Sequence, residues 1–316
     1  MIPEAVRLGI EGFEGHGRNA DVRSAGFGLN EDMKQNDRQR ALVSGAELQD
    51  RLESGVRIVE VDVDRDAYSH GHVPGADHWE WDRHLRNPVT SEVIGLGEFE
   101  ELMSASGIGP ETDVVLYGDN NNWFACWAYW VLRMYGHDRV RILDGGFKRW
   151  LAEGRPVSFE AAAVEPCVYQ ASGIDGEVIA TTEEVFGACL QPDRYRIVDA
   201  RTGPEFMGNF TGPGVGMDST CARGGHIPSA LNVPWIQNCR EDGTFKDPEE
   251  LRTLYEDLGI TRDKSVITYC AIGERASLTW FVLKAILGYE HVMNYDRSMA
   301  YWSRLPSAPV SCDPAA

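Results

Sequence analysis

The stretch Tyr-Gly-His-Asp-Arg-Val-Arg-Ile-Leu-Asp at residues 135–144 has a counterpart in Leu-Gly-Tyr-Glu-His-Val-Met-Asn-Tyr-Asp at residues 287–296, an offset of 152 residues. Upstream the pairing continues at another offset, with Gly-His-Val-Pro-Gly-Ala at 71–76 matching Gly-His-Ile-Pro-Ser-Ala at 225–230. A repeat of this length is typical of duplicated domains, because the units of solenoid proteins are only about 20–50 residues long. The sequence therefore predicts two copies of one domain within its 316 residues.

Each copy alternates short apolar runs with longer helical stretches. The runs are rich in Val and Ile, as buried strands are, and they lie at residues 58–61, 114–117, 140–143, 197–200, 266–269 and 292–295. Helices are expected at 123–135, 248–258 and 276–287. Buried strands that alternate with helices favour a parallel sheet covered by helices on both faces. The predicted fold class is therefore α/β, with two tandem domains.

The repeat also divides the chain. We expect residues 41–156 to form the first domain, residues 157–178 to link the copies, and residues 179–316 to form the second domain. Residues 1–40 have no counterpart in the second copy and are expected to form an extension. The Gly-rich stretch 208–216 lacks the ending of a phosphate-binding loop and is expected to be a surface excursion of the second copy.

Charge and hydropathy limit the classes of partner. A net charge of −19 repels phosphate backbones, which argues against general nucleic-acid binding. The longest apolar run, residues 123–132, is too short to span a bilayer, which needs about 20 residues. The first forty residues hold no apolar block of the kind found in signal peptides. We therefore expect a cytoplasmic protein with neither a membrane nor a nucleic-acid partner.

Among the seven cysteines, Cys270 stands apart. Their number is odd and none forms a Cys-x-x-Cys pair, so neither a zinc site nor a disulfide framework is expected. Cys270, however, follows a predicted strand and precedes a predicted helix, where α/β sheets bind ligands. The helix N-terminus and the charge of Arg275 favour the thiolate, and Gly273 lets backbone N–H groups turn toward the sulfur. The pattern predicts a nucleophilic thiolate in an anion-binding loop.

The motif Cys-x-x-Gly-x-Arg after a strand, with Asp-x-Arg at 199–201 and Gly-His-Ile-Pro-x-Ala upstream, resembles the rhodanese superfamily. The duplication resembles the two-domain sulfurtransferases of that superfamily. Residues 270–283 are especially similar to bacterial thiosulfate sulfurtransferases, as are Asn-Asn-Asn-Trp-Phe at 120–124 and Asp-Gly-Thr-Phe-Lys at 242–246. The resemblance covers residues 41–310.

The resemblance implies a reaction that needs neither a metal nor an organic cofactor. Cys270 would attack the outer sulfur of a small anionic donor, thiosulfate, and hold that sulfur as a persulfide until a thiophilic acceptor, cyanide in the test tube, removes it. The substrate-binding residues that it implies are Ala271, Ile272, Gly273, Glu274, Arg275 and Arg201.

The first copy is expected to be inactive. Gly118 occupies the position of the nucleophile, and Trp123 occupies the position of the arginine. Its implied role is to pack against the second domain and to wall the active cleft through Asn121, Asn122 and Trp123. The alternative is that these residues only build a polar turn and a core aromatic.

Two departures from the family pattern leave the donor open. Ala271 stands where the most similar sulfurtransferases carry Arg, and Glu205 stands where many two-domain enzymes carry a second substrate-binding Arg. Arg201 remains, but a buried ion pair with Asp199 or Glu205 is an equally good interpretation of it. The alternative donor is 3-mercaptopyruvate.

Three further interpretations concern the reaction itself. Phosphatases that share this fold place five residues between Cys and Arg, whereas four intervene here, which argues against a phosphate-sized loop. A persulfide carrier that delivers sulfur to a biosynthetic protein partner remains an alternative. His226 has a counterpart in His72 of the copy without a nucleophile, so a structural role is favoured over acid–base catalysis.

Overall fold

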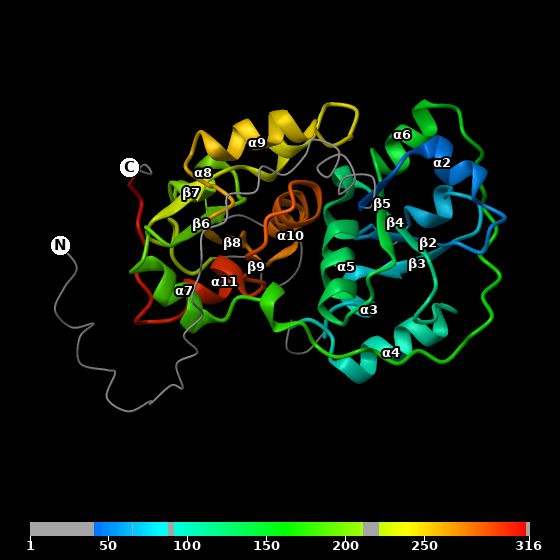
Figure 1. Ribbon diagram of the computed structural model, residues 1–316, viewed down its shortest axis with the longest axis horizontal. Coiled ribbons are helices and arrows are strands. Elements are labelled where there is room, and N and C mark those ends of the chain that lie inside the picture. Colours follow the sequence, from blue (N-terminus) through cyan, green and yellow to red (C-terminus); the bar gives the residue numbers. More distant parts are fainter. Residues whose placement is uncertain (1–40, 65, 88–91, 211–220, 314–316) are drawn as a thin grey trace, which may run out of the picture.

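The computed structural model describes residues 41–64, 66–87, 92–210 and 221–313 (Figure 1). The expected extension 1–40 and most of the excursion 208–216 lie outside these residues. The described chain forms two parallel sheets with helices packed on them, which confirms the α/β fold class and the duplication. The segment expected as a linker, 157–178, contains one short helix, η4 (Gly176–Val178), and no strand of either sheet.

The first domain is built on a five-stranded sheet with the order β1-β5-β4-β2-β3. All its strand pairs are parallel. Its strands are β1 (Leu42–Val43), β2 (Arg57–Asp62), β3 (Ala76–Glu80), β4 (Val114–Tyr117) and β5 (Val140–Leu143). Its helices are α2 (Gly45–Asp50), η2 (Tyr68–His70), α3 (Trp81–His84), α4 (Leu96–Ala105), η3 (Asn120–Asn122), α5 (Trp123–Met134) and α6 (Gly146–Ala152).

The second domain repeats this plan with the order β7-β6-β8-β9, again all parallel. A parallel bridge between Ile179 and Asn294 takes the place that β1 has in the first sheet. Its strands are β6 (Tyr195–Asp199), β7 (Ala230–Asn232), β8 (Ser265–Tyr269) and β9 (Val292–Asn294). Its helices are α7 (Thr182–Cys189), α8 (Gly203–Phe206), η5 (Trp235–Asn238), α9 (Pro248–Glu256), α10 (Glu274–Phe281), the π-helical turn η6 (Val282–Ile286) and α11 (Ser298–Trp302).

The six predicted strands are all present, with small differences at their ends. Three short strands, β1, β3 and β7, were not predicted because they lack the runs of Val and Ile that mark the other strands. The predicted helix at 276–287 begins two residues earlier, and its second half is the π-helical turn η6. Local signals fix other helix starts: Asp247 and Glu250 form a capping box around Pro248 at the start of α9.

The two domains meet at α5 and α10 (Figure 1). Phe124 to Leu132 are all buried in α5, as is every residue of α10. A helix that is apolar on all sides is stable only when it is covered on all sides. Here α5 packs between its own sheet and α10, and ring contacts such as Tyr129 on Phe281 join the two helices. One large apolar core therefore runs through both domains.

Corresponding positions of the two sheets hold different buried charge pairs. In the second domain, Asp199 at the end of β6 binds the guanidinium of Arg201 at 2.6 Å. In the first domain, the matching residues are Glu60 and Asp62, two carboxyl groups that hydrogen bond to each other. Burial, and then the neighbouring Glu60, raises the pKa of Asp62 to about 8. In the first domain a proton shared by Glu60 and Asp62 reduces the buried negative charge, whereas in the second domain Arg201 balances the charge of Asp199.

This proton predicts a pH effect on stability. Asp62→Asn keeps a donor toward Glu60 and an acceptor for the Asp119 N–H, but it removes the titrating group. Because the pKa of Asp62 is raised on folding, its contribution to stability is complete below about pH 4 and is lost as the pH rises through about 8. Between about pH 6 and pH 9 we expect the free energy of unfolding, measured with urea, to fall by roughly 1–3 kcal/mol more in the wild type than in the variant.

The control is Asp64→Asn, which removes an exposed carboxylate two residues further on. It should leave the pH dependence of the wild type unchanged. If the free energy of unfolding depends on pH in the same way in the wild type and in Asp62→Asn, no proton is shared between Glu60 and Asp62.

Candidate active site

Cys270 directly follows β8 at the carboxyl end of the second sheet, as predicted. The loop from Cys270 to Gly273 then leads into α10, so the N-terminal N–H groups of this helix lie next to the sulfur. Ser298 holds the start of the loop, because its hydroxyl accepts the Cys270 N–H at 3.0 Å and donates to Tyr295 O at 2.8 Å. The nucleophile is thus fixed by α11 as well as by its own strand.

Backbone N–H groups surround the Cys270 sulfur. Gly273 N–H donates to Sγ at 3.1 Å, and the N–H groups of Ile272 and Ala276 also point at it. Gly273 has φ +99°, and a Cβ there would lie 2.3 Å from Asp296 Oδ1, so only glycine allows this turn. The predicted N–H cradle is therefore present, and it stabilises negative charge on sulfur.

The charge around the sulfur differs from the prediction. Arg275 does not face the nucleophile alone, because its guanidinium makes two hydrogen bonds to the carboxylate of Glu205, at 2.9 and 3.0 Å. Glu274 Oε2 lies 3.5 Å from Cys270 Sγ. Glu274 therefore lies beside the thiol, and Glu205 offsets the charge of Arg275, where the sequence indicated a positive site.

The expectation that this environment favours the thiolate is wrong. Burial, and then the adjacent Glu274, raises the pKa of the Cys270 thiol to about 12, although Arg275 and the loop N–H groups act in the opposite direction. The side chain of Cys270 is 0% exposed, and Trp235 packs against it. Burial in this closed arrangement therefore disfavours the thiolate form of Cys270.

The first domain supplies a residue to this site that the sequence did not reveal. Arg86 reaches across the interface and donates to the carbonyl of Ile272, inside the catalytic loop, at 2.8 Å. Its guanidinium also pairs with Asp296 at 3.3 Å and lies over the rings of Trp81 and Trp127. No motif surrounds Arg86 in the sequence, and its partners lie about 200 residues away, so only the fold identifies it.

Arg201 lies in a different environment from the loop residues. Its guanidinium pairs with Asp199 and donates to Gly225 O at 2.8 Å, and the residue is 1% exposed. This is the ion-pair interpretation that the sequence left open, and it ties the 225 segment to the end of β6. Substrate binding by Arg201 stays a prediction.

The three predicted wall residues of the first domain have different surroundings. Asn122 is buried and closes its own turn, accepting from Gly118 N and donating to Leu143 O. Trp123 instead faces the second domain and packs on Trp235, with ring centroids 4.8 Å apart. A Cβ on Gly243 would lie 3.2 Å from Asn121 Oδ1, so this side chain also faces the second domain.

Gly118 shows why the first domain offers no equivalent site. A Cβ at this position would lie 2.3 Å from Val61 O, which is closer than real Cβ contacts. The following residues, Asn120, Asn121 and Asn122, all have positive φ, an arrangement that Asn tolerates better than most residues. The loop thus follows a path with no room for a side chain where the second domain has its nucleophile.

His226 packs as a structural residue. Its ring stacks on Phe206 with centroids 3.6 Å apart, and its Nδ1 hydrogen bonds to Phe206 O. His72 repeats this arrangement in the first domain, stacked on Tyr68 and bonded to its carbonyl. The shared geometry agrees with the structural role favoured by the sequence.

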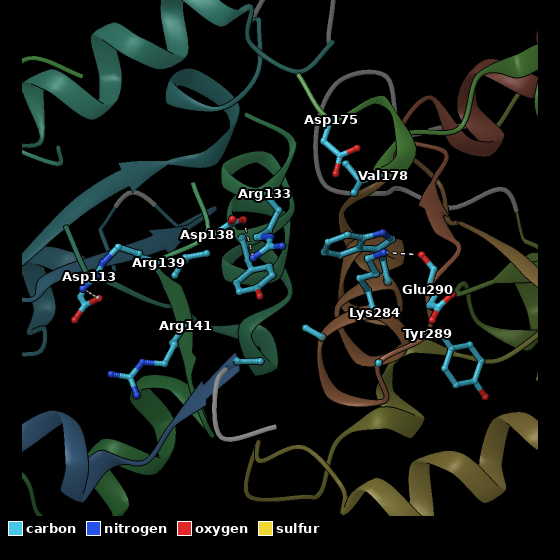
Figure 2. Close-up of a pocket in the computed structure, with 16 residues that line it drawn as sticks. Asp113, Arg133, Asp138, Arg139, Arg141, Asp175, Val178, Lys284, Tyr289 and Glu290 are labelled. Atoms are coloured by element: carbon cyan, nitrogen blue, oxygen red, sulfur yellow. Dashed lines mark hydrogen bonds and ion pairs between the residues drawn. The ribbon is translucent and has the colours of Figure 1, made fainter. Parts of the chain in front are cut away.

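A separate cavity of about 950 Å³ opens between the domains at the other ends of α5 and α10 (Figure 2). Tyr129, Trp280 and Lys284 contribute to its walls, and no residue of the 270–275 loop lines it. Its charged side chains include paired ones, such as Arg133 with Asp138 and Arg139 with Asp113. This cavity is therefore distinct from the candidate site.

No group of three or more His, Cys, Asp or Glu side chains is placed to hold a metal ion in the described part of the chain. Among the described helices, none has both the length and the apolar character needed to cross a bilayer.

Comparison with known proteins extends this picture. A family model described as a rhodanese-like domain matches residues 44–153 and again residues 184–305. The "Sulfur carrier protein TtuD" of Thermus thermophilus is 42% identical over 273 residues, covering 85% of this chain and 96% of that protein. A protein of Saccharopolyspora erythraea named "Putative thiosulfate sulfurtransferase" is 42% identical over 274 residues, covering 86% of this chain and 96% of its own.

A solved structure gives the same fold. The anaerobic ergothioneine biosynthesis enzyme from Chlorobium limicola, in complex with trimethyl histidine, matches with a TM-score of 0.76. The match covers 87% of this chain and 70% of that enzyme, at 23% sequence identity. At this identity the likeness concerns the fold alone.

The contact of Arg86 with the catalytic loop predicts a large effect of its removal. In Arg86→Met, the buried Asp296 loses its ion pair and the Ile272 carbonyl loses a donor. Breaking a buried pair costs about 3–5 kcal/mol, so we expect the apparent melting temperature to fall by roughly 6–15 °C. Differential scanning calorimetry measures this change.

Arg83→Met is the matched control. Arg83 lies on the same segment, but its side chain is 59% exposed and pairs with Glu80 on the surface. Its loss should change stability by about 0.5 kcal/mol at most. Equal shifts for the two variants would contradict a special role of Arg86.

Proposed function

This chain belongs to the rhodanese-like family of sulfurtransferases, and we propose that it moves sulfane sulfur from thiosulfate to a thiophilic acceptor through a persulfide on Cys270. The observation that carries this proposal is the Cys270 sulfur inside a ring of backbone N–H groups, with Gly273 N–H at 3.1 Å. Such groups stabilise an anionic sulfur both in the thiolate and in the persulfide, as the donors of an oxyanion hole stabilise oxygen.

The proposed reaction has two half-reactions at the same atom. Cys270 Sγ attacks the outer sulfur of thiosulfate, a new S–S bond forms, and sulfite leaves with the electron pair of the old bond. The acceptor then attacks the outer sulfur of the persulfide and returns Cys270 to its starting state. Four residues separate Cys270 from Arg275, one fewer than in phosphatases of this fold, which favours this chemistry over transfer of a larger phosphoryl group.

Thiosulfate is the proposed donor, and the similarity to proteins named for it supports this choice. The loop N–H groups are the main anion-binding feature described, because Arg275 is engaged with Glu205 and position 271 is Ala. Anion binding by such a site is weaker than by one with a free cation. 3-Mercaptopyruvate, which carries a single carboxylate, is the second donor to test.

A second candidate function is transfer of the persulfide sulfur to a protein partner. It is favoured by the 42% identity to a protein named as a sulfur carrier. The Cys270 chemistry is the same until the acceptor arrives, so only the acceptor distinguishes the two functions. Discharge of the persulfide that is far faster with a protein or thiol acceptor than with cyanide would favour the carrier.

The first half-reaction can be measured by intact mass. After incubation with thiosulfate, and separately with 3-mercaptopyruvate, the wild type should gain one sulfur, about 32 Da. Cys270→Ser should gain none, and cyanide should remove the added mass from the wild type. The donor that loads the protein at the lower concentration identifies the better substrate.

Cys312→Ser is the matched control, because Cys312 is the exposed cysteine among those described. It should load as the wild type does. Equal mass gain on Cys270→Ser would refute the assignment of Cys270, and no gain with either donor would refute both donors.

A further inference from the structure

Glu274 contacts Cys270, but neither half-reaction of the proposed sulfur transfer assigns it a role. Its Oε2 lies 3.5 Å from Cys270 Sγ. Its Oε1 is buried without a hydrogen-bond partner among the described residues, and the residue is 1% exposed. A buried carboxylate with an unsatisfied oxygen costs free energy unless a charge or a proton neutralises it. The adjacent proton is the one on the Cys270 thiol.

We propose that Glu274 is a catalytic proton acceptor, which takes the proton of the Cys270 thiol as the sulfur attacks and returns it when the sulfur has been delivered. This inference rests on the proposed function and assigns one step of it. At rest the pair is a thiol beside a carboxylate, and during attack it becomes a thiolate beside a carboxylic acid.

The cation next to Glu274 is shared with a carboxylate outside the pair. Arg275 Nε lies 3.9 Å from Glu274 Oε1, but the Arg275 guanidinium is bound by the Glu205 carboxylate. From the first domain, Arg86 faces the same loop, and Asp296 pairs with it. Each cation is therefore matched by a carboxylate outside the pair.

An internal transfer avoids the cost of creating a charge in this site. Burial raises the pKa of both Cys270 and Glu274, so it disfavours an additional negative charge in this site. Exchange of the proton between Sγ and Oε2 leaves the net charge of the site unchanged. The N–H groups of Ile272, Gly273 and Ala276 then stabilise the thiolate as it forms.

The step balances without an oxidant or a reductant. The Cys270 S–H bond breaks and its proton moves to Glu274 Oε2, while the electron pair on Sγ forms the bond to the outer sulfur of thiosulfate. The S–S bond of thiosulfate breaks, and its pair leaves on sulfite. When the acceptor takes the outer sulfur, the pair of the persulfide bond returns to Sγ, and the Glu274 proton returns with it.

Alkylation of Cys270 by iodoacetamide tests this step without any sulfur donor, so its result does not depend on which donor is used. The rate at Cys270 is measured from about pH 6 to pH 9 by peptide mapping, and the exposed Cys312 in the same digest reports the behaviour of the reagent. In the wild type the rate at Cys270 should be nearly independent of pH, because the proton stays within the protein. In Glu274→Gln, which cannot accept a proton, the rate near pH 7 should fall about 100-fold and rise about tenfold per pH unit.

A purely electrostatic role predicts the opposite. If Glu274 only repels the thiolate, Glu274→Gln removes that repulsion, and alkylation becomes faster. A Glu274→Gln rate equal to or above that of the wild type would therefore overturn the proposal, as would a wild-type rate that climbs tenfold per pH unit. The second criterion needs no variant and holds even if Glu274→Gln fails to fold.

Glu274→Asp and Glu205→Gln complete the comparison. Glu274→Asp keeps a carboxylate and should retain a weak pH dependence at a lower rate. Glu205→Gln releases the Arg275 charge toward the sulfur and should speed alkylation. If both Glu→Gln variants speed the reaction, the two carboxylates act by charge alone and the proposal fails.

Discussion

The packing of α5 against α10 determines where the working parts of this protein lie. Both helices are buried, and each begins at the loop that follows a strand of its sheet, β4 or β8. Packing them side by side brings the two loops to one end of the domain interface. Arg86 can then bind the Cys270 loop, and Trp123 can pack on Trp235 next to the nucleophile. The first domain thus contributes contacts to the candidate site of the second.

The buried carboxylates near the strand ends of the two domains are neutralised in different ways, by an arginine or by a proton. Asp199 is matched by an arginine, whereas Glu60 is matched by a proton on Asp62. Beside Cys270, Arg275 makes two hydrogen bonds to Glu205 and only a longer ion pair, at 3.9 Å, with Glu274. The low dielectric of the interior makes each of these arrangements costly to change. The reactivity of the thiol is consequently set by neighbours that are not adjacent to it in sequence.

Much of the architecture could be predicted from the sequence, since internal repetition and apolar runs are local signals. The six main strands and the place of Cys270 at a strand end follow from such signals. The electrostatics could not be predicted in this way. Arg275 indicated a cationic site, but Glu205, seventy residues earlier, neutralises it. Arg86 was missed for the same reason, because its partners come together only when the two domains pack.

The crowding at Gly118 bears on how such a duplicated protein changes over time. A cysteine there would have its Cβ 2.3 Å from Val61 O, and the three left-handed asparagines that follow would have to adopt another path. A single substitution to cysteine at this position therefore does not reproduce the arrangement around Cys270. Descendants of this chain inherit an asymmetric pair, in which the first copy is free to diverge wherever it does not touch its neighbour. Its remaining constraint is the shape that it presents to the second copy.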